Sequence, residues 1–501
     1  MLLLGDVLVR QSDRTRRADK LAAVFETREG VVDRATYGEL NARVNRIANA
    51  LRVAKGERVA VLGRNSLEYV AIYFALAKLG AVMVPVNFWY RVDEVRYTIE
   101  QSGSSLLLAD EPFVPLATQA AAHVVSFGDL RAAAEHASDA EPGIAVHESD
   151  PHIILYTSGT TGFPKGATLS HRAHYLHALA WALQTGQDER DVGVVVYPLF
   201  HTGGPDCVVL PHFLVGGTVV IHDGADPELM LAAVERHRLT NVFCVPTVWR
   251  RLLAALAAHR VDVGSVRRCL GSSDTLPPDL LDEMLARFDS DVYVTYGLTE
   301  AGCILTYSKL TREDRSHIGS VGKPHPLVDV RVVGPDGSAL RPNEVGEVVA
   351  RGPTVMDGYW AMPERTAEAM EGGWLHTGDL GRFDDEGYLY LAGRAKDVIV
   401  SGGEKIYPLE VERLIKQIPG VRDCALIGVP DREWGESVLA VVVADGDPPD
   451  PDEVKRFVRT RLAGYKTPRY VEYVDALPVT TATGKVQKAV LRERFGPTYA
   501  R

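Results

Sequence analysis

Residues 156–166 read Tyr-Thr-Ser-Gly-Thr-Thr-Gly-Phe-Pro-Lys-Gly, directly after the apolar, strand-like residues 153–155. Three glycines let the backbone approach an anion closely, and four Ser and Thr hydroxyls with one lysine supply the donors that a triphosphate requires. The segment is not a Walker A loop, because Lys165 follows a proline and the glycine spacing differs. A surface turn is the alternative, but this density of donors favours a phosphate-binding loop.

Strand and helix signals alternate around this loop. Residues 58–62 predict a buried strand, Asn65-Ser66 a helix cap, Gly80 the end of that helix, and residues 81–86 the next strand. A strand–helix–strand unit predicts parallel pairing with a right-handed crossover. The pattern returns in predicted strands at 241–245, 266–270 and 291–295 and predicted helices at 248–258 and 278–288.

The pattern changes toward the C-terminus. Residues 328–350 predict short antiparallel strands, and the residues after 395 predict a small α+β domain with helices over 409–417 and 452–462 and a strand over 424–429. The fold class is therefore α/β: a large N-terminal region of parallel sheets with an antiparallel portion over 1–395, then a small mobile α+β domain over 396–501. Residues 132–150 are expected to form a mobile loop.

Composition excludes several classes of protein. The 501 residues carry 55 basic and 66 acidic side chains, a net charge of −11, which argues against binding nucleic acid or anionic membranes through bulk charge. The five cysteines are scattered and form no CxxC pair, so neither a disulfide scaffold nor a zinc ribbon is expected. The expected location is a reducing cytoplasm. The short apolar start is too brief for a signal peptide, and charged residues and glycines interrupt any membrane span.

Four further motifs follow the loop in order: Tyr-Gly-Leu-Thr-Glu at 296–300, Trp-Leu-His-Thr-Gly-Asp at 374–379, Gly-Arg-Ala-Lys-Asp at 393–397 with Ser-Gly-Gly-Glu-Lys-Ile-Tyr-Pro-Leu-Glu at 401–410, and Thr-Gly-Lys at 483–485. Together with the loop they resemble the adenylate-forming enzymes, which include acyl-CoA synthetases, firefly-type luciferases and the adenylation domains of peptide synthetases. The resemblance covers essentially the whole chain. It implies an AMP-forming acid–thiol ligase, with ATP and Mg²⁺ used in activation and CoA as the acyl acceptor.

The resemblance also implies roles for individual residues. Lys485 is expected to bridge the carboxylate and the α-phosphate during adenylation, which suits the compact charge of lysine. Alone it would be read as a solvent lysine in a basic tail. Glu300 and Thr157 are the expected Mg²⁺ ligands. The other residues expected at ATP or AMP are Ser158, Gly159, Thr160, Thr161 and Lys165 at the phosphates, Thr299 at the α-phosphate, Gly271, Ser272, Tyr296 and Gly297 near the adenine, Asp379 at the ribose, and Arg394 at the ribose or a phosphate.

In the resembling family the C-terminal domain rotates between the two half-reactions, and Lys396 occupies the hinge position. Rotation is expected to bring Gly402 and Gly403 to the active site, where two glycines allow the close approach that a pantetheine tunnel needs. The nucleotide end of CoA is expected near Trp434, Tyr465, Lys466 and Arg469. Thr467 stands where some aryl-CoA ligases carry an arginine, which leaves the phosphate contacts open.

His201 is expected to close the acyl pocket near the carboxylate, with a structural histidine as the alternative. The expected walls are Gly203, Gly204, Phe243, Thr247, Gly302 and Cys303. None of these is charged, which favours a largely apolar monocarboxylic acid, either fatty, aryl or alicyclic, over a diacid or an amino acid. Ser272 and Ser273 indicate a polar substituent on the acid. The alternative is that they have no effect on substrate choice, since a serine can hydrogen-bond to its own backbone.

The leading hypothesis is an ATP-dependent carboxylic acid:CoA ligase. A stand-alone enzyme that loads a carrier protein is the first alternative, and a non-catalytic nucleotide-binding protein on the same scaffold is the second. Gly402, Gly403 and Trp434 favour free CoA as acceptor. No nucleic-acid partner or membrane span is expected; dimers are common in the family, so a homodimer is among the expected assemblies.

Overall fold

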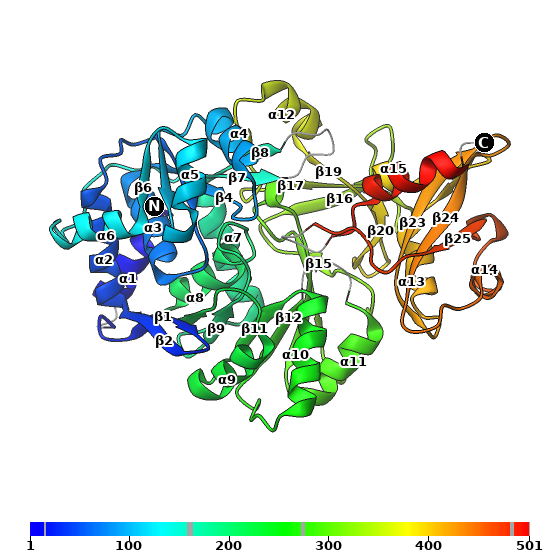
Figure 1. The fold of residues 1–501 in the computed structure, drawn as a ribbon, viewed down its shortest axis with the longest axis horizontal. Coiled ribbons are helices and arrows are strands. Elements are labelled where there is room, and N and C mark those ends of the chain that lie inside the picture. The colour runs from blue at the N-terminus through cyan, green and yellow to red at the C-terminus, as the bar shows by residue number, and fades with distance from the viewer. Residues whose placement is uncertain (15–16, 158–163, 272–275, 481–484, 500–501) are drawn as a thin grey trace. The chain divides into compact units, whose positions relative to one another are not determined.

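The computed structural model describes residues 1–14, 17–157, 164–271, 276–480 and 485–499 (Figure 1). The chain forms two compact units. The first comprises Met1–Val330 and Ala350–Leu375, and the second comprises Arg331–Val349 and His376–Arg501. The predicted boundary after residue 395 falls inside the second unit, and the start of a mobile domain stays a prediction.

A seven-stranded sheet in the first unit has the order β18-β8-β7-β4-β3-β5-β6. Strands β7, β4, β3, β5 and β6 run parallel, and β8 runs antiparallel to both β7 and β18. The predicted parallel pairing of residues 58–62 with residues 81–86 is confirmed. The strands are β3 (Arg58–Leu62), β4 (Val82–Val86), β5 (Leu106–Ala109), β6 (Val124–Ser126), β7 (Pro151–Thr157), β8 (Lys165–Ser170) and β18 (Gly358–Tyr359).

Helix α3 (Leu67–Leu79) is buried along its entire length. Its sequence is apolar on all sides, which is typical of a helix enclosed by protein, and it contacts β4 of this sheet and β1 of the next. The Ser66 hydroxyl caps its N-terminus by accepting from the Tyr69 N–H, 3.1 Å away. Gly80 ends it at φ +62°, the left-handed conformation that glycine adopts without steric cost. The predicted helix bounds are confirmed.

A nine-stranded sheet has the order β15-β14-β13-β12-β11-β9-β10-β1-β2. Its middle is parallel from β13 to β1, while β14, β15 and β2 are antiparallel to their neighbours. The strands are β1 (Leu21–Thr27), β2 (Gly30–Thr36), β9 (Val192–Val195), β10 (Thr218–Ile221), β11 (Asn241–Cys244), β12 (Arg268–Gly271), β13 (Asp291–Tyr296), β14 (Thr306–Leu310) and β15 (Lys323–Pro324). Helices α9, α10 and α11 pack their apolar side chains against it.

The helices of the first unit other than α3 surround these sheets (Figure 1). They are α1 (Asp6–Arg14), α2 (Tyr37–Ala50), α4 (Val92–Ser102), α5 (Val114–Ala120), α6 (Phe127–Glu135), α7 (His171–Thr185), α8 (Leu210–Val215), α9 (Pro227–His237), α10 (Pro246–Ala258), α11 (Pro278–Arg287) and α12 (Pro363–Ala369), with a π-helical turn η2 (Pro205–Val209) ahead of α8. Residues 132–150, which the sequence predicts to be a mobile loop, are held by contacts with two helices. Asn45 donates to the carbonyl of Asp139 at 2.8 Å, and Lys78 pairs with Glu141 at 2.7 Å.

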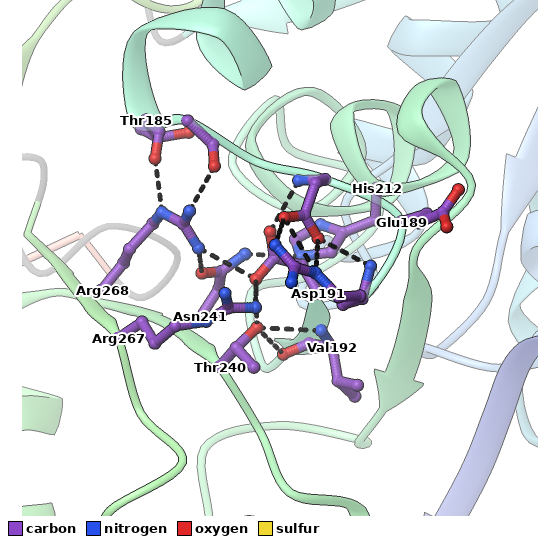
Figure 2. A network of polar contacts seen from close by, with 12 residues as sticks. Thr185, Glu189, Asp191, Val192, His212, Thr240, Asn241, Arg267 and Arg268 are labelled. Atoms are coloured by element: carbon purple, nitrogen blue, oxygen red, sulfur yellow. Dashed lines mark hydrogen bonds and ion pairs between the residues drawn. The ribbon is translucent and has the colours of Figure 1, made fainter.

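A buried polar network joins several of these elements (Figure 2). The carboxylate of Asp191, which is fully buried, accepts hydrogen bonds from Thr240 at 2.7 Å, Arg267 at 2.8 Å and Arg268 at 2.9 Å. Arg268 also donates to Asn241, and Asn241 donates to Nε2 of His212 at 2.8 Å. Burial lowers the pKa of His212 to about 4, so the neutral ring can accept this bond. The network therefore holds β11, β12 and α8 in one arrangement.

The second unit contains a four-stranded sheet, β16-β17-β19-β20, and a five-stranded sheet, β22-β21-β24-β23 with β25 beside β24. On β23, side chains alternate: Cys424 and Leu426 face a core with α13 and α14, and Ala425 and Ile427 face a core with α15. The elements are β16 (Asp329–Val333), β17 (Gly346–Arg351), β19 (Leu375–Phe383), β20 (Leu389–Arg394), β21 (Ile399–Ser401), β22 (Glu404–Ile406), α13 (Pro408–Ile415), β23 (Val421–Asp431), β24 (Gly435–Ala444), α14 (Pro451–Arg459), β25 (Tyr470–Tyr473) and α15 (Lys488–Tyr499). The predicted α+β composition is confirmed.

Within the described parts of the chain, none of the helices has the length and apolar character that crossing a bilayer demands.

Candidate active site

Strands β7 and β8 carry the two ends of the first motif. Their register places Thr157, the last residue of β7, opposite Lys165, the first residue of β8. The predicted phosphate ligands Ser158, Gly159, Thr160 and Thr161 lie between these ends and outside the described residues. The Lys165 ammonium lies 5.0 Å from the ring centroid of Tyr359, a residue of β18 that also pairs with β8.

The predicted metal ligands Thr157 and Glu300 are in contact. The Thr157 hydroxyl donates to Oε1 of Glu300 at 3.1 Å, across 143 positions of sequence. Glu300 lies in a short 3₁₀ turn, η3 (Thr299–Ala301), that follows β13. The hydroxyl of Tyr359 donates to the same oxygen at 3.0 Å. Burial and the Glu300 carboxylate raise the pKa of Tyr359, so it remains a hydrogen-bond donor at neutral pH.

The Glu300 carboxylate and the Thr157 hydroxyl offer oxygen ligands of the kind that Mg²⁺ prefers. Among the described residues, no group of three or more His, Cys, Asp or Glu side chains could hold a metal by itself. Mg²⁺ usually takes one or two protein oxygens and completes its shell with phosphates and water. One carboxylate with a neighbouring hydroxyl therefore fits a magnesium ion that arrives with a nucleotide.

The second motif and the residues just after it are tightly packed. A side chain at Gly297 would place its Cβ 1.8 Å from the Cys303 carbonyl oxygen, and one at Gly302 would lie 2.2 Å from the Thr354 carbonyl oxygen. The Tyr296 side chain is 8% exposed, so most of its ring lies among protein atoms. Gly271 is buried at the end of β12, next to β13, while Ser272 lies outside the described residues.

The predicted acyl residues come from three segments, 201–204, 243–247 and 302–303. His201 precedes η2 and its Nδ1 accepts from the Gly203 N–H at 3.2 Å. The rings of Tyr197 and Phe243 pack with centroids 5.0 Å apart, and a Cβ at Gly203 would lie 3.3 Å from the Tyr197 ring. Gly204 lies similarly against the carbonyl oxygen of Pro198, whereas Thr247 is exposed at the start of α10.

A contact joins these acyl residues to the second motif. The Sγ atoms of Cys207, in η2, and Cys303, just after η3, are 3.3 Å apart. The predicted acyl segment and the predicted adenylate segment are therefore neighbours in the first unit. Gly302 and Cys303, both predicted pocket walls, lie at this junction.

Asn65 holds the segment before His201. The sequence predicts it as part of a helix cap, but Ser66 alone caps α3. The Asn65 side chain, 3% exposed, donates to the carbonyl of Tyr197 at 2.7 Å and accepts from the N–H of Leu199 at 2.7 Å. Its amide thus replaces the backbone partners that this irregular segment lacks.

Sequence reasoning missed Tyr359 and Tyr197. Tyr359 belongs to a strand of two residues, too short to leave a periodic pattern, and Tyr197 follows β9 in an irregular segment. The only available signal was a tyrosine next to a glycine or proline at an element end. That signal is too common to select either residue.

In the second unit, Asp379 and Arg394 are partners. They lie opposite each other on β19 and β20, and the Arg394 Nε is 3.1 Å from Oδ1 of Asp379. The predicted hinge residue Lys396 follows two positions later in a 3₁₀ turn, η5 (Ala395–Asp397), and is exposed.

The predicted CoA residues also lie in the second unit. Trp434 and Tyr465 are 46% and 45% exposed. A Cβ at Gly402 would lie 2.5 Å from the Trp434 ring, so a glycine is needed there, while Gly403 has open space. Lys466 pairs with Glu410 at 2.7 Å, and Arg469 pairs with Asp431 at 3.0 Å.

Lys485 is exposed, and its backbone is hydrogen-bonded to Thr480. Its N–H donates to the hydroxyl of Thr480 at 3.1 Å, and the Thr480 N–H donates to the Lys485 carbonyl at 2.8 Å. Residues 481–484 between them lie outside the described chain. The predicted roles of Lys485 and of the other site residues stay predictions.

Comparison with known proteins identifies the family. Residues 9–360 match the model of the AMP-binding enzyme, and residues 410–485 match that of the AMP-binding enzyme C-terminal domain. A feruloyl-CoA synthase from Amycolatopsis sp is 43% identical over 474 residues, 92% of this chain and 94% of the relative. A long-chain-fatty-acid–CoA ligase from Mycobacterium tuberculosis is 34% identical, over 93% of this chain and 94% of the relative.

A solved structure agrees along the entire chain. ATP-bound MatB from Rhodopseudomonas palustris has a TM-score of 0.90 at 33% identity, covering 99% of both chains. The predicted fold class and the predicted enzyme class are confirmed. The chain belongs to the AMP-binding enzyme family and, within it, to the ATP-dependent acid:CoA ligases.

Proposed function

We propose that this chain joins a monocarboxylic aryl acid, such as ferulate, to CoA. In the first step a carboxylate oxygen attacks the α-phosphorus of ATP and pyrophosphate leaves. In the second, the CoA sulfur attacks the acyl carbon, loses its proton, and AMP leaves as the thioester forms. Both steps bring anions together, so the protein contributes mainly positioning and charge neutralisation.

The contact between Thr157 and Glu300 is the main observation that supports the proposed activation step. Two hydroxyls, from Thr157 and Tyr359, orient one oxygen of the carboxylate, with the Lys165 ammonium near the Tyr359 ring. Magnesium bound to this carboxylate and to ATP would neutralise phosphate charge as pyrophosphate leaves. Thr299, adjacent to Glu300 in η3, is proposed to contact the α-phosphate.

The aromatic pair Tyr197 and Phe243 supports an aryl acid. The Tyr197 ring, which is partly exposed and packs against Phe243 and Gly203, offers an apolar surface on which a planar substrate can lie. The six predicted wall residues, all described, carry no charge that could pair with a second carboxylate. The 43% identity to a feruloyl-CoA synthase supports the same class of acid. His201 is proposed to contact the carboxylate end.

The second unit is proposed to supply the residues that change between the two steps. Asp379 and Arg394, already paired, are proposed at the ribose, and Lys485 at the carboxylate and α-phosphate during adenylation. Rotation about Lys396, with the mobile domain starting at 396, is proposed to exchange Lys485 for Gly402 and Gly403.

The acceptor surface is proposed around the exposed rings of Trp434 and Tyr465. An adenine ring can stack on either. Lys466 and Arg469 follow Tyr465 closely in sequence. Lys466 forms an ion pair with Glu410 and Arg469 forms one with Asp431, and a CoA phosphate is proposed to compete with these carboxylates for the two cations.

We also propose that the enzyme works in the reducing cytoplasm. All five cysteines are free, as expected where thiols are kept reduced. A homodimer is the assembly to test, by light scattering at several protein concentrations.

The direct test is AMP release from ATP and Mg²⁺ with a panel of acids, with and without CoA. The panel includes cinnamates, benzoates, alicyclic acids and fatty acids of increasing length. Strong CoA-dependent AMP release with cinnamates or benzoates supports the proposal, and preference for a long-chain fatty acid would overturn the aryl assignment. Pyrophosphate release without CoA-stimulated AMP release would point to a carrier-protein acceptor instead.

A further inference from the structure

Two thiols meet where the predicted acyl segment contacts the second motif. Cys207 and Cys303 are 96 positions apart in sequence, yet their sulfurs are 3.3 Å apart. Joining them as a disulfide needs an approach of about 1.2 Å, since an S–S bond is close to 2.05 Å long. Both residues belong to the first unit, so their proximity does not depend on the second.

Helix α7 holds both segments in place. On one side, the indole N–H of Trp181 donates to the Cys207 carbonyl at 3.0 Å, and the ring of His174 is hydrogen-bonded to the Asp206 carboxylate. On the other side, Nε2 of His177 accepts from the N–H of Ile304 at 3.2 Å. The same helix therefore positions the residues next to each cysteine, and all three of its contacting side chains are buried.

The backbone at Cys303 is unusually constrained. Its φ is +117°, in the region that favours glycine, and such a conformation persists only when the surroundings impose it. Gly297 and Gly302 lie so close to neighbouring carbonyl groups that neither tolerates a Cβ. The backbone that carries Cys303 is thus fixed by the packing of this loop.

The two thiols differ in accessibility. Cys303 is partly exposed, whereas Cys207 is 2% exposed. Burial, with the adjacent Cys303, raises the pKa of the Cys207 thiol well above its usual value, so Cys207 is a poor first target for an oxidant. An oxidant that enters the site therefore meets Cys303 first, with a second thiol already in contact behind it.

We propose that Cys207 and Cys303 form a reversible disulfide under hydroperoxide stress. The Cys303 sulfur attacks the peroxide, breaking the O–O bond, to give a sulfenic acid and water (or an alcohol). The Cys207 sulfur then attacks the sulfenic sulfur; the S–S bond forms, and the sulfenic hydroxyl leaves as water with the Cys207 proton. Two thiols are oxidised and one peroxide is reduced. A dithiol reductant reverses the change.

The disulfide has a consequence that rests on the proposed function. It would tie η2 to the loop that follows Glu300, drawing together two segments proposed to line the acyl and adenylate sites. Substrate would then meet a narrowed and stiffened site. We expect the oxidised enzyme to lose at least tenfold in acid-dependent AMP formation, and to recover after reduction with dithiothreitol.

Peptide mapping tests the bond without reference to activity. Trypsin places each cysteine in its own peptide, Cys207 in 191–236 and Cys303 in 288–309. After brief treatment of the full chain with hydrogen peroxide, alkylation and non-reducing digestion, we expect these two peptides linked, lighter than their sum by two hydrogen atoms. Cys303 oxidised to sulfinic acid with Cys207 alkylated, or a first disulfide between other cysteines, would overturn the proposal.

Variants separate the bond from its effect on activity. Each variant is compared with itself before and after peroxide. Cys207→Ala and Cys303→Ala should not form the link after peroxide treatment. Cys424→Ala, which removes an equally buried thiol from the second unit, should behave like the parent. A link that forms while activity is unchanged would overturn the regulatory effect, and a link in a chain without ligase activity would refute only the proposed function.

Discussion

The hydroxyl of Thr157 and the carboxylate of Glu300 lie 3.1 Å apart, although 143 positions separate them in sequence. Thr157 ends a strand of one sheet, and Glu300 follows a strand of the other. The two sheets of the first unit therefore converge on one small group of oxygen atoms. The contact joins the first two motifs in space, and the first two predictions below depend on it.

Glu300→Gln should lower the rate of adenylation at least about 100-fold, because it removes the negative charge proposed to bind magnesium while keeping the shape of the side chain. Pyrophosphate release measured over a magnesium titration checks this, and the variant should also require more magnesium. The matched control Glu364→Gln changes an exposed glutamate of the same unit. Equal magnesium dependence in the two variants would contradict the ligand role.

Tyr359→Phe should slow adenylation about 10- to 150-fold, since a hydrogen bond to a charged group contributes about 1.5–3 kcal/mol. The loss arises because the hydroxyl no longer orients Oε1 of Glu300. Stopped-flow or quenched-flow measurement of pyrophosphate release gives the rate. Tyr175→Phe, which removes a hydroxyl bonded to Arg10, is the control and should leave the rate unchanged.

Lys485→Ala should abolish formation of the acyl-adenylate but spare thioester formation from a supplied acyl-adenylate and CoA. Lys396→Pro should do the reverse, because it restricts the proposed hinge. Single-turnover assays of each half-reaction separate the two effects. Lys455→Ala, a lysine of α14 in a surface ion pair, should change neither step. Equal loss of both steps in Lys485→Ala would disprove its assigned role.

Asp191→Ala should destabilise the first unit by about 3–5 kcal/mol, because it leaves the buried guanidinium of Arg268 without its charged partner. Figure 2 shows how many groups converge on this carboxylate. Urea unfolding followed by circular dichroism measures the change. Asp262→Ala, which breaks an exposed pair with Arg238, should have little effect, and similar loss in both variants would contradict the importance of burial.

Stability should fall as the pH drops from about 6.5 to about 4. Burial lowers the pKa of both His171 and His212 to about 4, so in this window each binds more protons in the unfolded chain than in the folded one. Each can therefore remove about 3 kcal/mol of unfolding free energy by pH 4. Urea unfolding at several pH values checks the slope.

A variant assigns that slope. His171→Phe keeps a ring against His152, 4.9 Å away between centroids in the native pair, but cannot titrate. Its unfolding free energy should depend less steeply on pH than that of the parent. His259→Phe, which changes a half-exposed histidine, should keep the parental slope; no difference between the two variants would contradict the buried origin.

Local signals predicted the fold well where they were strong. The unit β3–α3–β4 follows from an apolar strand, a serine cap and a terminal glycine, each acting over a few residues. The composition of residues 132–150, rich in Ala, His and acidic residues, predicts a mobile loop. Its partners Asn45 and Lys78 come from distant helices, and such partners leave no local pattern.

The site shows the same division. Motif order pointed to Thr157 and Glu300, but Tyr359, the position of Asn65 and the meeting of Cys207 with Cys303 depend on tertiary packing. The structure brings Asp379 to Arg394 as well, on facing strands whose pairing the motifs alone did not predict. The motifs therefore select candidate residues, whereas the contacts that orient those residues could not be predicted from the sequence.

The most direct test of the adenylate mechanism traces the oxygen atoms of the substrate carboxylate into the products. The enzyme is given ATP, CoA and an aryl acid whose carboxylate carries ¹⁸O at both positions, and the products are analysed by mass spectrometry. If the carboxylate attacks the α-phosphorus, one ¹⁸O appears in AMP and one remains in the thioester. Thioester formed with unlabelled AMP, or with ¹⁸O in inorganic phosphate and release of ADP, would contradict the adenylate mechanism.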